Sequence, residues 1–266
     1  MSATMNPSAA QSAWLFIPCY VDQLMPEIGM AMVRVLQRLG VSLTYPQQQT
    51  CCGQPALNSG YNDEAACVAR RMIDIFAPAV AAGAKVVVPS GSCATMVKVF
   101  TPQLLAGTKD EAAAQAVGEA TWEFADYLVN VLGLDESAIA SRLGSTFPHK
   151  VTIHDGCHGL RELGISEAPR TLLRGVKGLE IVEMGEAKTC CGFGGTFAVK
   201  YAQVSVAMAE VKCKSAADTG AAYIVSTDPS CLMQIRGYTE KQKMPVKTLH
   251  IAQVLDGQAA QAGGAA

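Results

Sequence analysis

Cysteine is the residue type of this 266-residue chain with the clearest capacity for chemistry, because most of its ten copies follow one period. Eight of them form pairs whose members are separated by 138 or 139 residues. The pairs are Cys19 with Cys157, Cys51 with Cys190, Cys52 with Cys191, and Cys93 with Cys231. A glycine follows the adjacent cysteines in both halves, as Gly53 and Gly192. A period of half the chain indicates a duplicated domain and not a solenoid, whose repeats are about 20 to 50 residues long.

Four thiolates that converge from distant segments can hold a metal centre, and this donor set suits zinc or an iron–sulfur cluster. Structural zinc usually takes cysteine pairs with about two to four residues between them. Each half of this chain instead offers an adjacent pair and two distant single cysteines. Adjacent side chains of an extended segment point to opposite sides, so they reach two irons of a cluster more easily than one ion. We therefore favour a cluster, with a mononuclear metal or purely redox-active thiols as alternatives.

The elements that must position these cysteines alternate between strands and helices. Strands are predicted at residues 14–18, 41–45, 85–89, 151–154, 179–184 and 223–227. Helices are predicted at residues 26–39, 63–80, from 93 onward, from 157 to about 174, and at 197–217. In every unit the cysteines follow the carboxyl end of a strand, where open α/β sheets place their ligand sites. The predicted fold class is α/β, with two tandem pseudo-symmetric lobes, small parallel sheets, right-handed crossovers and one cysteine site in each lobe.

The period also suggests domain boundaries, at residues 14–135 for the first cysteine-rich domain and 150–256 for the second. The segment 106–145 joins the halves, and we expect in it an Ala-rich helix with a buried stripe of Trp122, Phe124 and Leu128. Residues 247–255 are interpreted as its counterpart at the end of the second half.

Composition excludes several classes of protein. Apolar residues make up 50% and charged residues 17%, which is typical of a globular chain with a sizeable core. A formal net charge of −2 gives no electrostatic footprint for nucleic acid or an anionic membrane. No apolar run reaches the length of a membrane span, and residues 1–13 lack the pattern of a secretory signal. Many cysteines without an export signal indicate metal or redox work in a reducing cytoplasm, where we expect this protein.

The doubled pattern resembles a known family. Cys–(31/32)–Cys-Cys-Gly–(40/39)–Cys, present twice over residues 14–256, resembles the cysteine-rich CCG domain. That domain occurs in the B subunit of heterodisulfide reductase and in iron–sulfur subunits of glycolate oxidase and anaerobic glycerol-3-phosphate dehydrogenase. It also occurs in the lactate utilisation protein A family, also called the E subunit of an L-lactate dehydrogenase complex. A chain of this length with two repeats is most similar to this last family.

The resemblance implies one or two [4Fe–4S] clusters held by two ligand sets. These are Cys19, Cys51, Cys52 and Cys93, and then Cys157, Cys190, Cys191 and Cys231. It implies an oxidoreductase subunit that is inactive alone and passes electrons from L-lactate as pyruvate forms, together with a ferredoxin-like iron–sulfur subunit and a third small subunit. Alternatives are a heterodisulfide-reductase-like or glycolate-oxidase-like iron–sulfur subunit, or a metal-stabilised scaffold without catalysis.

One departure from the family separates these alternatives. In heterodisulfide reductase the last cysteine of each repeat begins a Cys-x-x-Cys, which provides a fifth thiolate for a noncubane cluster. Met96 and Gln234 occupy the second of these positions here. Four thiolates suffice for an ordinary [4Fe–4S] cluster, so the difference counts against disulfide-reducing chemistry. The chain also lacks a nucleophile elbow, a P-loop or a paired acid/base motif, which leaves hydrolase and kinase functions without support.

Other conspicuous residues are given structural interpretations. Cys67 and Cys213 have no counterpart in the period and are expected to be small core residues. His154 and His158 flank Cys157, but Phe16 and Tyr20 stand at the matching places of the first half. Capping or packing is therefore favoured over a role in tuning a cluster or relaying a proton. His250 is expected to pack on a terminal helix or lie at the surface, and Gly192–Gly195 lack the context of a dinucleotide site.

Overall fold

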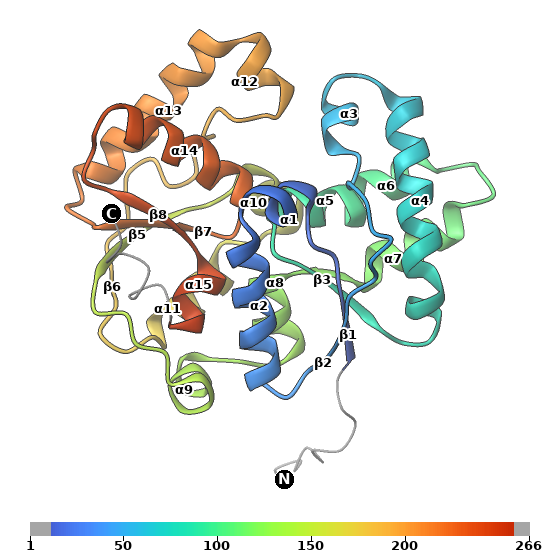
Figure 1. Ribbon diagram of the computed structural model, residues 1–266, viewed down its shortest axis with the longest axis horizontal. Coiled ribbons are helices and arrows are strands. Elements are labelled where there is room, and N and C mark those ends of the chain that lie inside the picture. Colours follow the sequence, from blue (N-terminus) through green and yellow to red (C-terminus); the bar gives the residue numbers. More distant parts are fainter. Residues whose placement is uncertain (1–11, 258–266) are drawn as a thin grey trace.

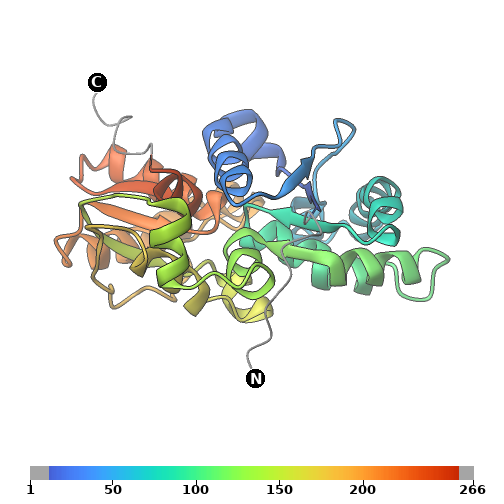
Figure 2. The same cartoon turned by 90° about the horizontal axis from the view of Figure 1, so that it is seen from below.

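The computed structural model describes residues 12–257 and contains two sheets of four parallel strands each. The strand orders are β2-β1-β3-β4 and β6-β5-β7-β8, so the two halves have the same topology. Figure 1 shows the two sheets in neighbouring lobes, and the view from below shows the same separation (Figure 2). The predicted α/β class with two tandem pseudo-symmetric lobes is confirmed.

The first lobe is built as the alternating pattern predicts. Its strands are β1 (Ser12–Leu15), β2 (Ser42–Thr44), β3 (Lys85–Val88) and β4 (Thr121–Glu123). Its α-helices are α1 (Cys19–Leu24), α2 (Pro26–Arg38), α3 (Gln54–Asn58), α4 (Asn62–Ala81), α5 (Gly91–Thr95), α6 (Thr101–Leu104), α7 (Glu111–Ala120) and α8 (Phe124–Asp126). Single turns of π-helix extend α5 and α8, at Met96–Phe100 and Tyr127–Val131.

The second lobe follows after α9 (Glu136–Ala138) and a third π-helical turn at Ile139–Leu143. Its strands are β5 (Lys150–His154), β6 (Glu180–Ile181), β7 (Tyr223–Ser226) and β8 (Lys247–His250). Its helices are α10 (Cys157–Leu163), α11 (Glu167–Arg174), α12 (Thr196–Lys200), α13 (Ala202–Ala217), α14 (Pro229–Lys241) and α15 (Ile251–Asp256). No helix in residues 12–257 combines the length and the apolar character that a membrane crossing requires.

The duplication extends to the register of the strands. Trp14 of β1 pairs with Val86 of β3, and Thr152 of β5 pairs with Ile224 of β7, which preserves the offset of 138 residues. In both sheets these two strands are central, and the cysteines follow their carboxyl ends. The matched register explains why the cysteines of both lobes gather at equivalent places.

Two helices predicted as continuous are interrupted. Gly164, with φ +70°, separates α10 from α11, because this left-handed conformation ends the first helix. Tyr201 separates α12 from α13 with a non-helical backbone. Both breaks fall inside continuous apolar periodicity, which does not signal them.

The Ala-rich helix predicted to carry Trp122 is wrong at its end. The helix stops at Ala120, and Trp122 lies in strand β4, paired with Val87 of β3. Phe124 and Leu128 are fully buried, as expected, but lie beyond that strand. A strand of three residues is too short to interrupt the helical period of its neighbours. The interpretation of residues 247–255 as a counterpart agrees with the structure, since β8 and α15 repeat β4 and α8.

The two lobes share a hydrophobic core. Helix α15 packs against α2, as Figure 1 shows, and Val35 and Leu36 belong to the same buried apolar cluster as Val254 and Leu255. An ion pair of 2.7 Å joins Arg34 to the buried carboxylate of Asp256 at the edge of this contact. The last helix of the second lobe therefore completes the core of the first.

Candidate metal centre

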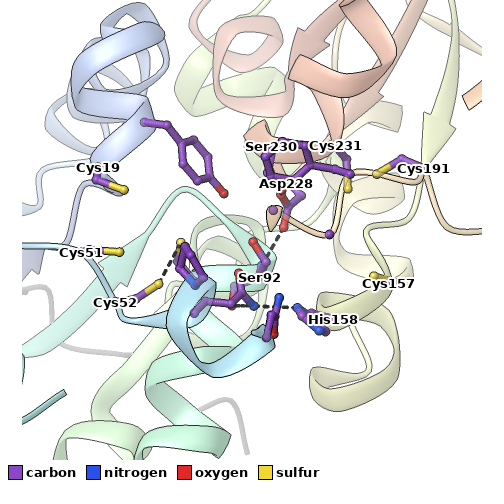
Figure 3. Close-up of a pocket in the computed structure, with 18 of the residues that line it drawn as sticks. Cys19, Cys51, Cys52, Ser92, Cys157, His158, Cys191, Asp228, Ser230 and Cys231 are labelled. Atoms are coloured by element: carbon purple, nitrogen blue, oxygen red, sulfur yellow. Dashed lines mark hydrogen bonds between the residues drawn. The ribbon is translucent and has the colours of Figure 1, made fainter. Parts of the chain in front are cut away.

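One cavity of about 140 Å³ lies between the lobes and is lined by every cysteine of the duplicated pattern. Figure 3 shows cysteines of the first lobe on one side and cysteines of the second lobe on the other. We call them the first cysteine group, which is Cys19, Cys51, Cys52 and Cys93, and the second cysteine group, which is Cys157, Cys190, Cys191 and Cys231. The sequence pattern predicts a site in each lobe, and the structure places both on one shared cavity.

The thiols of the first cysteine group form a continuous series. Sγ of Cys52 lies 3.6 Å from Sγ of Cys93, and the Cys51 thiol is hydrogen-bonded to those of Cys19 and Cys52. Cys19 begins α1 and Cys93 lies in α5, so segments far apart in the sequence contribute to one group. The second cysteine group repeats this series, from Cys157 through Cys190 and Cys191 to Cys231.

A tight turn directs the adjacent cysteines of each group. Gly53 and Gly192 have φ of +93° and +88°, a conformation that glycine adopts without strain. Their backbone N–H groups donate to Sγ of Cys51 and Cys190, at 3.4 Å in both lobes. A Cβ on Gly192 would approach the carbonyl oxygen of Ser205 to 2.6 Å, so this turn also fits closely against α13.

Hydrogen bonding distributes the protons unevenly within each group. The pKa of Cys51 is lowered to about 2, because the thiols of Cys19 and Cys52 donate hydrogen bonds to it. The pKa of Cys190 is lowered to about 2 by Cys157 and Cys191. The donor thiols have raised pKa values for the converse reason, with burial contributing. Each group is therefore prepared to hold one thiolate, and metal binding would displace the remaining protons.

His154 adds an unsatisfied nitrogen donor to the second cysteine group. It ends β5 with 1% of its surface exposed, and neither ring nitrogen has a hydrogen-bond partner. A ring nitrogen, Sγ of Cys191 and Sγ of Cys231 lie within 4.8 Å of one another. Burial lowers the pKa of His154 to about 3, so the ring is neutral. Buried polar atoms normally have partners. The orphaned ring and four converging thiols in each lobe fit a thiolate-bound metal centre.

Polar contacts join the two lobes at the cavity. Oδ2 of Asp228 accepts a hydrogen bond of 2.7 Å from the backbone N–H of Ser92, between the two groups (Figure 3). Nε2 of Gln54 donates to the Ser92 carbonyl and lies 2.8 Å from Nδ1 of His158. The buried Tyr20 hydroxyl contacts Ser92 and Ser230, and burial raises its pKa. These contacts hold the two groups in one frame.

Sequence reasoning missed three of these residues. Asp228 caps α14 through Ser230, and its place just before the second Pro-Ser-Cys was a usable signal. Tyr20 and Gln54 each follow a cysteine motif directly, but nothing in their type distinguishes them from packing residues. The structural interpretation of His158 agrees with its contact to Gln54.

The residues expected to have no metal role lie outside the cavity. Cys213 is fully buried in α13, as expected, and burial raises its pKa to about 12. Cys67 was expected in the core but is exposed on α4. His250 is not on a helix at the surface: it ends β8, is fully buried and caps α15 by accepting from the Ala252 N–H at 3.1 Å. The terminal strand places it inside the sheet edge.

Comparison with known proteins supports the duplication. The family model of the cysteine-rich domain CCG matches residues 13–98 and again residues 151–236. The fold is similar to one solved structure, a hypothetical protein from Helicobacter pylori, with a TM-score of 0.61 and 11% identity, covering 98% of this chain and 50% of that one. At this identity the likeness concerns the fold alone.

Curated relatives match nearly the whole chain. Lactate utilization protein A 1 of Bacillus mycoides is 42% identical over 250 residues, which cover 94% of this chain and 98% of the relative. Lactate utilization protein A of Bacillus velezensis is 42% identical over 244 residues, covering 92% and 98%. The chain therefore belongs to the cysteine-rich CCG domain family and, within it, to the family of the lactate utilization A proteins.

Proposed function

We propose that each cysteine group holds a [4Fe–4S] cluster, and that the protein is the redox subunit of a system that oxidises L-lactate to pyruvate. The observation that carries this proposal is the convergence of two duplicated sets of four thiols on one cavity. The substrate comes from the relatives, which are named for lactate utilisation. The proposed limits of the two cluster-binding domains are residues 14–135 and 150–256.

A bound cluster supplies one-electron transfer at a potential that its surroundings set. The cysteines provide the thiolates, and the turns at Gly53 and Gly192 orient the adjacent pairs. Met96 is fully buried, and Gln234 donates to Ser205 at 2.8 Å. Neither position offers a fifth thiolate, so the four-thiolate cluster is the proposed form.

The cavity is unsuited to bind lactate itself. Lactate is a carboxylate, and carboxylates are usually recognised by arginine or lysine. Among the described residues that line the cavity there is no lysine or arginine, and its histidine, His158, already contacts Gln54. We therefore place lactate oxidation, which releases two electrons and two protons, on a partner subunit. The proposed partners are a ferredoxin-like iron–sulfur subunit and a third small subunit.

The decisive experiment is metal analysis of protein purified without oxygen. We expect iron and acid-labile sulfide in equal amounts, with a broad visible absorption that reductant bleaches. After addition of the partner subunits, lactate should bleach the same absorption. Colourless protein with stoichiometric zinc would overturn the cluster, and an iron–sulfur protein that lactate cannot reduce through any partner would overturn the substrate.

A further inference from the structure

The two cysteine groups have different surroundings, although the backbone around them is duplicated. His154 ends β5 at the place where Phe16 follows β1 in the first lobe. Phe16 is fully buried and has no group that could donate a hydrogen bond or carry charge. The second group alone therefore has an imidazole within ligand distance of its sulfurs.

A second difference lies on the helix that packs beneath each tight turn. A Cβ on Gly53 would meet Ala65 and Val68 of α4, and one on Gly192 would meet Ser205 and Met208 of α13. These contacts align the two helices with an offset of 140 residues. Under this alignment the fully buried Lys212 takes the place of Met72, which is fully buried too. The cysteine period of 138 or 139 residues hides this equivalence.

Lys212 is a buried cation without an acidic partner. Its Nζ donates to the carbonyl oxygens of Glu186 and Ala187, and no carboxylate in residues 12–257 forms an ion pair with it. The charges that oppose it across the interior are the thiols of Cys191 and Cys231. A buried charge is costly unless it is paired. The natural counter-charge of Lys212 is thus the anionic centre that the second cysteine group would hold.

These differences have a predictable effect on electron affinity. Each electron added to a thiolate-bound centre increases its negative charge. A buried ammonium stabilises that charge, since attraction is strong where water is excluded, and an N–H directed at sulfur acts in the same sense. Phe16 and Met72 provide neither effect around the first cysteine group.

We infer that Lys212 and His154 give the second-lobe centre the higher reduction potential, so that electrons enter at the first lobe and move to the second. In this step one electron leaves the reduced first centre and reduces the second, and no bond forms or breaks. The inference rests on the proposed function, because it requires a centre in each lobe.

The test is a redox titration, followed by electron paramagnetic resonance, of full-length chains that keep one centre each. Cys52→Ser leaves the second-lobe centre and Cys191→Ser leaves the first. Iron and sulfide are measured first, so a missing cluster, which would overturn the proposed function, is distinguished from a wrong order of potentials. We expect a higher midpoint potential in the Cys52→Ser chain. Equal or reversed potentials in two loaded chains would overturn the inference alone.

Lys212→Met, which installs the first-lobe residue, assigns the cause. In the Cys52→Ser chain it should lower the ratio of reduced to oxidised centre at least tenfold at fixed potential, a shift of 59 mV. Lys212→Arg should retain most of the difference, and His154→Phe should cause a smaller shift in the same direction. In the Cys191→Ser chain, Lys212→Met should leave the midpoint unchanged. A shift of equal size in both chains would show a general structural effect and contradict the assignment.

Discussion

The two lobes have the same topology, strand register and cysteine spacing, but they surround their cysteines with different chemistry. The first lobe places apolar side chains next to its group: Phe16, Met72 and Met96. The second lobe places polar ones at the equivalent positions: His154, Lys212 and Gln234. The backbone thus decides where the sulfurs gather, while the lining decides what a centre there can do. Each prediction below replaces a residue in one lobe and compares the result with its counterpart.

Loss of a ligand should have the largest effect. Cys52→Ser and Cys191→Ser each replace a thiolate by a hydroxyl, which is a poor ligand for a cluster. We expect each variant to lose the iron of its own lobe, about half of the total, and to abolish lactate-dependent electron transfer. Iron and sulfide assays measure this result directly.

The matched controls are Cys67→Ser on exposed α4 and Cys213→Ser in buried α13. Both should keep their iron, and Cys213→Ser should lose only some stability because a hydroxyl is buried. Iron loss from Cys67→Ser equal to that from Cys52→Ser would mean that the period identifies the wrong cysteines.

The turn glycines should differ in their tolerance of a methyl group. Gly53→Ala forces a positive φ on alanine, at a cost of about 1–2 kcal/mol. Gly192→Ala has the same strain and also brings a Cβ to 2.6 Å from a backbone oxygen, against 3.3 Å at Gly53. We expect it to lower the free energy of unfolding by about 3 kcal/mol or more. Chemical denaturation of the two variants decides; equal losses would contradict the closer fit of the second turn.

Glu123 and His250 are register counterparts with opposite charge behaviour. Each ends the edge strand of its sheet and caps the next helix. Burial raises the pKa of Glu123 to about 8 and lowers that of His250 to about 4. Glu123 therefore reduces stability as pH rises from about 4.5 to 8, because only the unfolded chain ionises freely. His250 reduces stability as pH falls from about 6.5 to 4, because the unfolded chain takes up the proton.

Replacing either residue should flatten its own side of the pH–stability curve. Glu123→Gln should relieve a penalty of up to about 3 kcal/mol at neutral pH and leave the acid side unchanged. His250→Asn should flatten the acid side alone. Unfolding free energies measured from pH 4 to 9 test both expectations, and an unchanged alkaline slope in Glu123→Gln would refute the first.

Asp228 and Ser90 cap equivalent helices, but Asp228 also crosses to the other lobe. Asp228→Ser keeps a capping hydroxyl and loses the contact with the Ser92 N–H, so we expect about 2 kcal/mol of destabilisation. Ser90→Ala loses one cap, worth about 1 kcal/mol. Thermal and chemical unfolding measure both variants. A larger loss from Ser90→Ala would remove Asp228 from its role between the lobes.

Much of this organisation was predictable because the cysteines mark the ends of strands. Once their period is known, topology rules place each set at one sheet edge, and the α/β lobes follow. The shared cavity was not predictable, since it depends on how α5 and α10 pack between the lobes. Trp122 was misplaced because a three-residue strand leaves no periodic signal. Lys212 escaped notice because one extra residue between Gly192 and α13 shifts it out of the cysteine period, and a lone lysine on a helix ordinarily faces water.

The packing of α15 against α2 has a consequence for the order of synthesis. Helix α2 emerges from the ribosome early, but the apolar face around Val35 and Leu36 is covered by Val254 and Leu255, which are translated more than 200 residues later. A nascent chain therefore carries an exposed sticky surface through most of its elongation, and it cannot close the first lobe until α15 has left the exit tunnel. Chaperone engagement would be concentrated on α2, and a ribosome stalled before residue 251 would release a half-finished first lobe whatever its cysteines had bound.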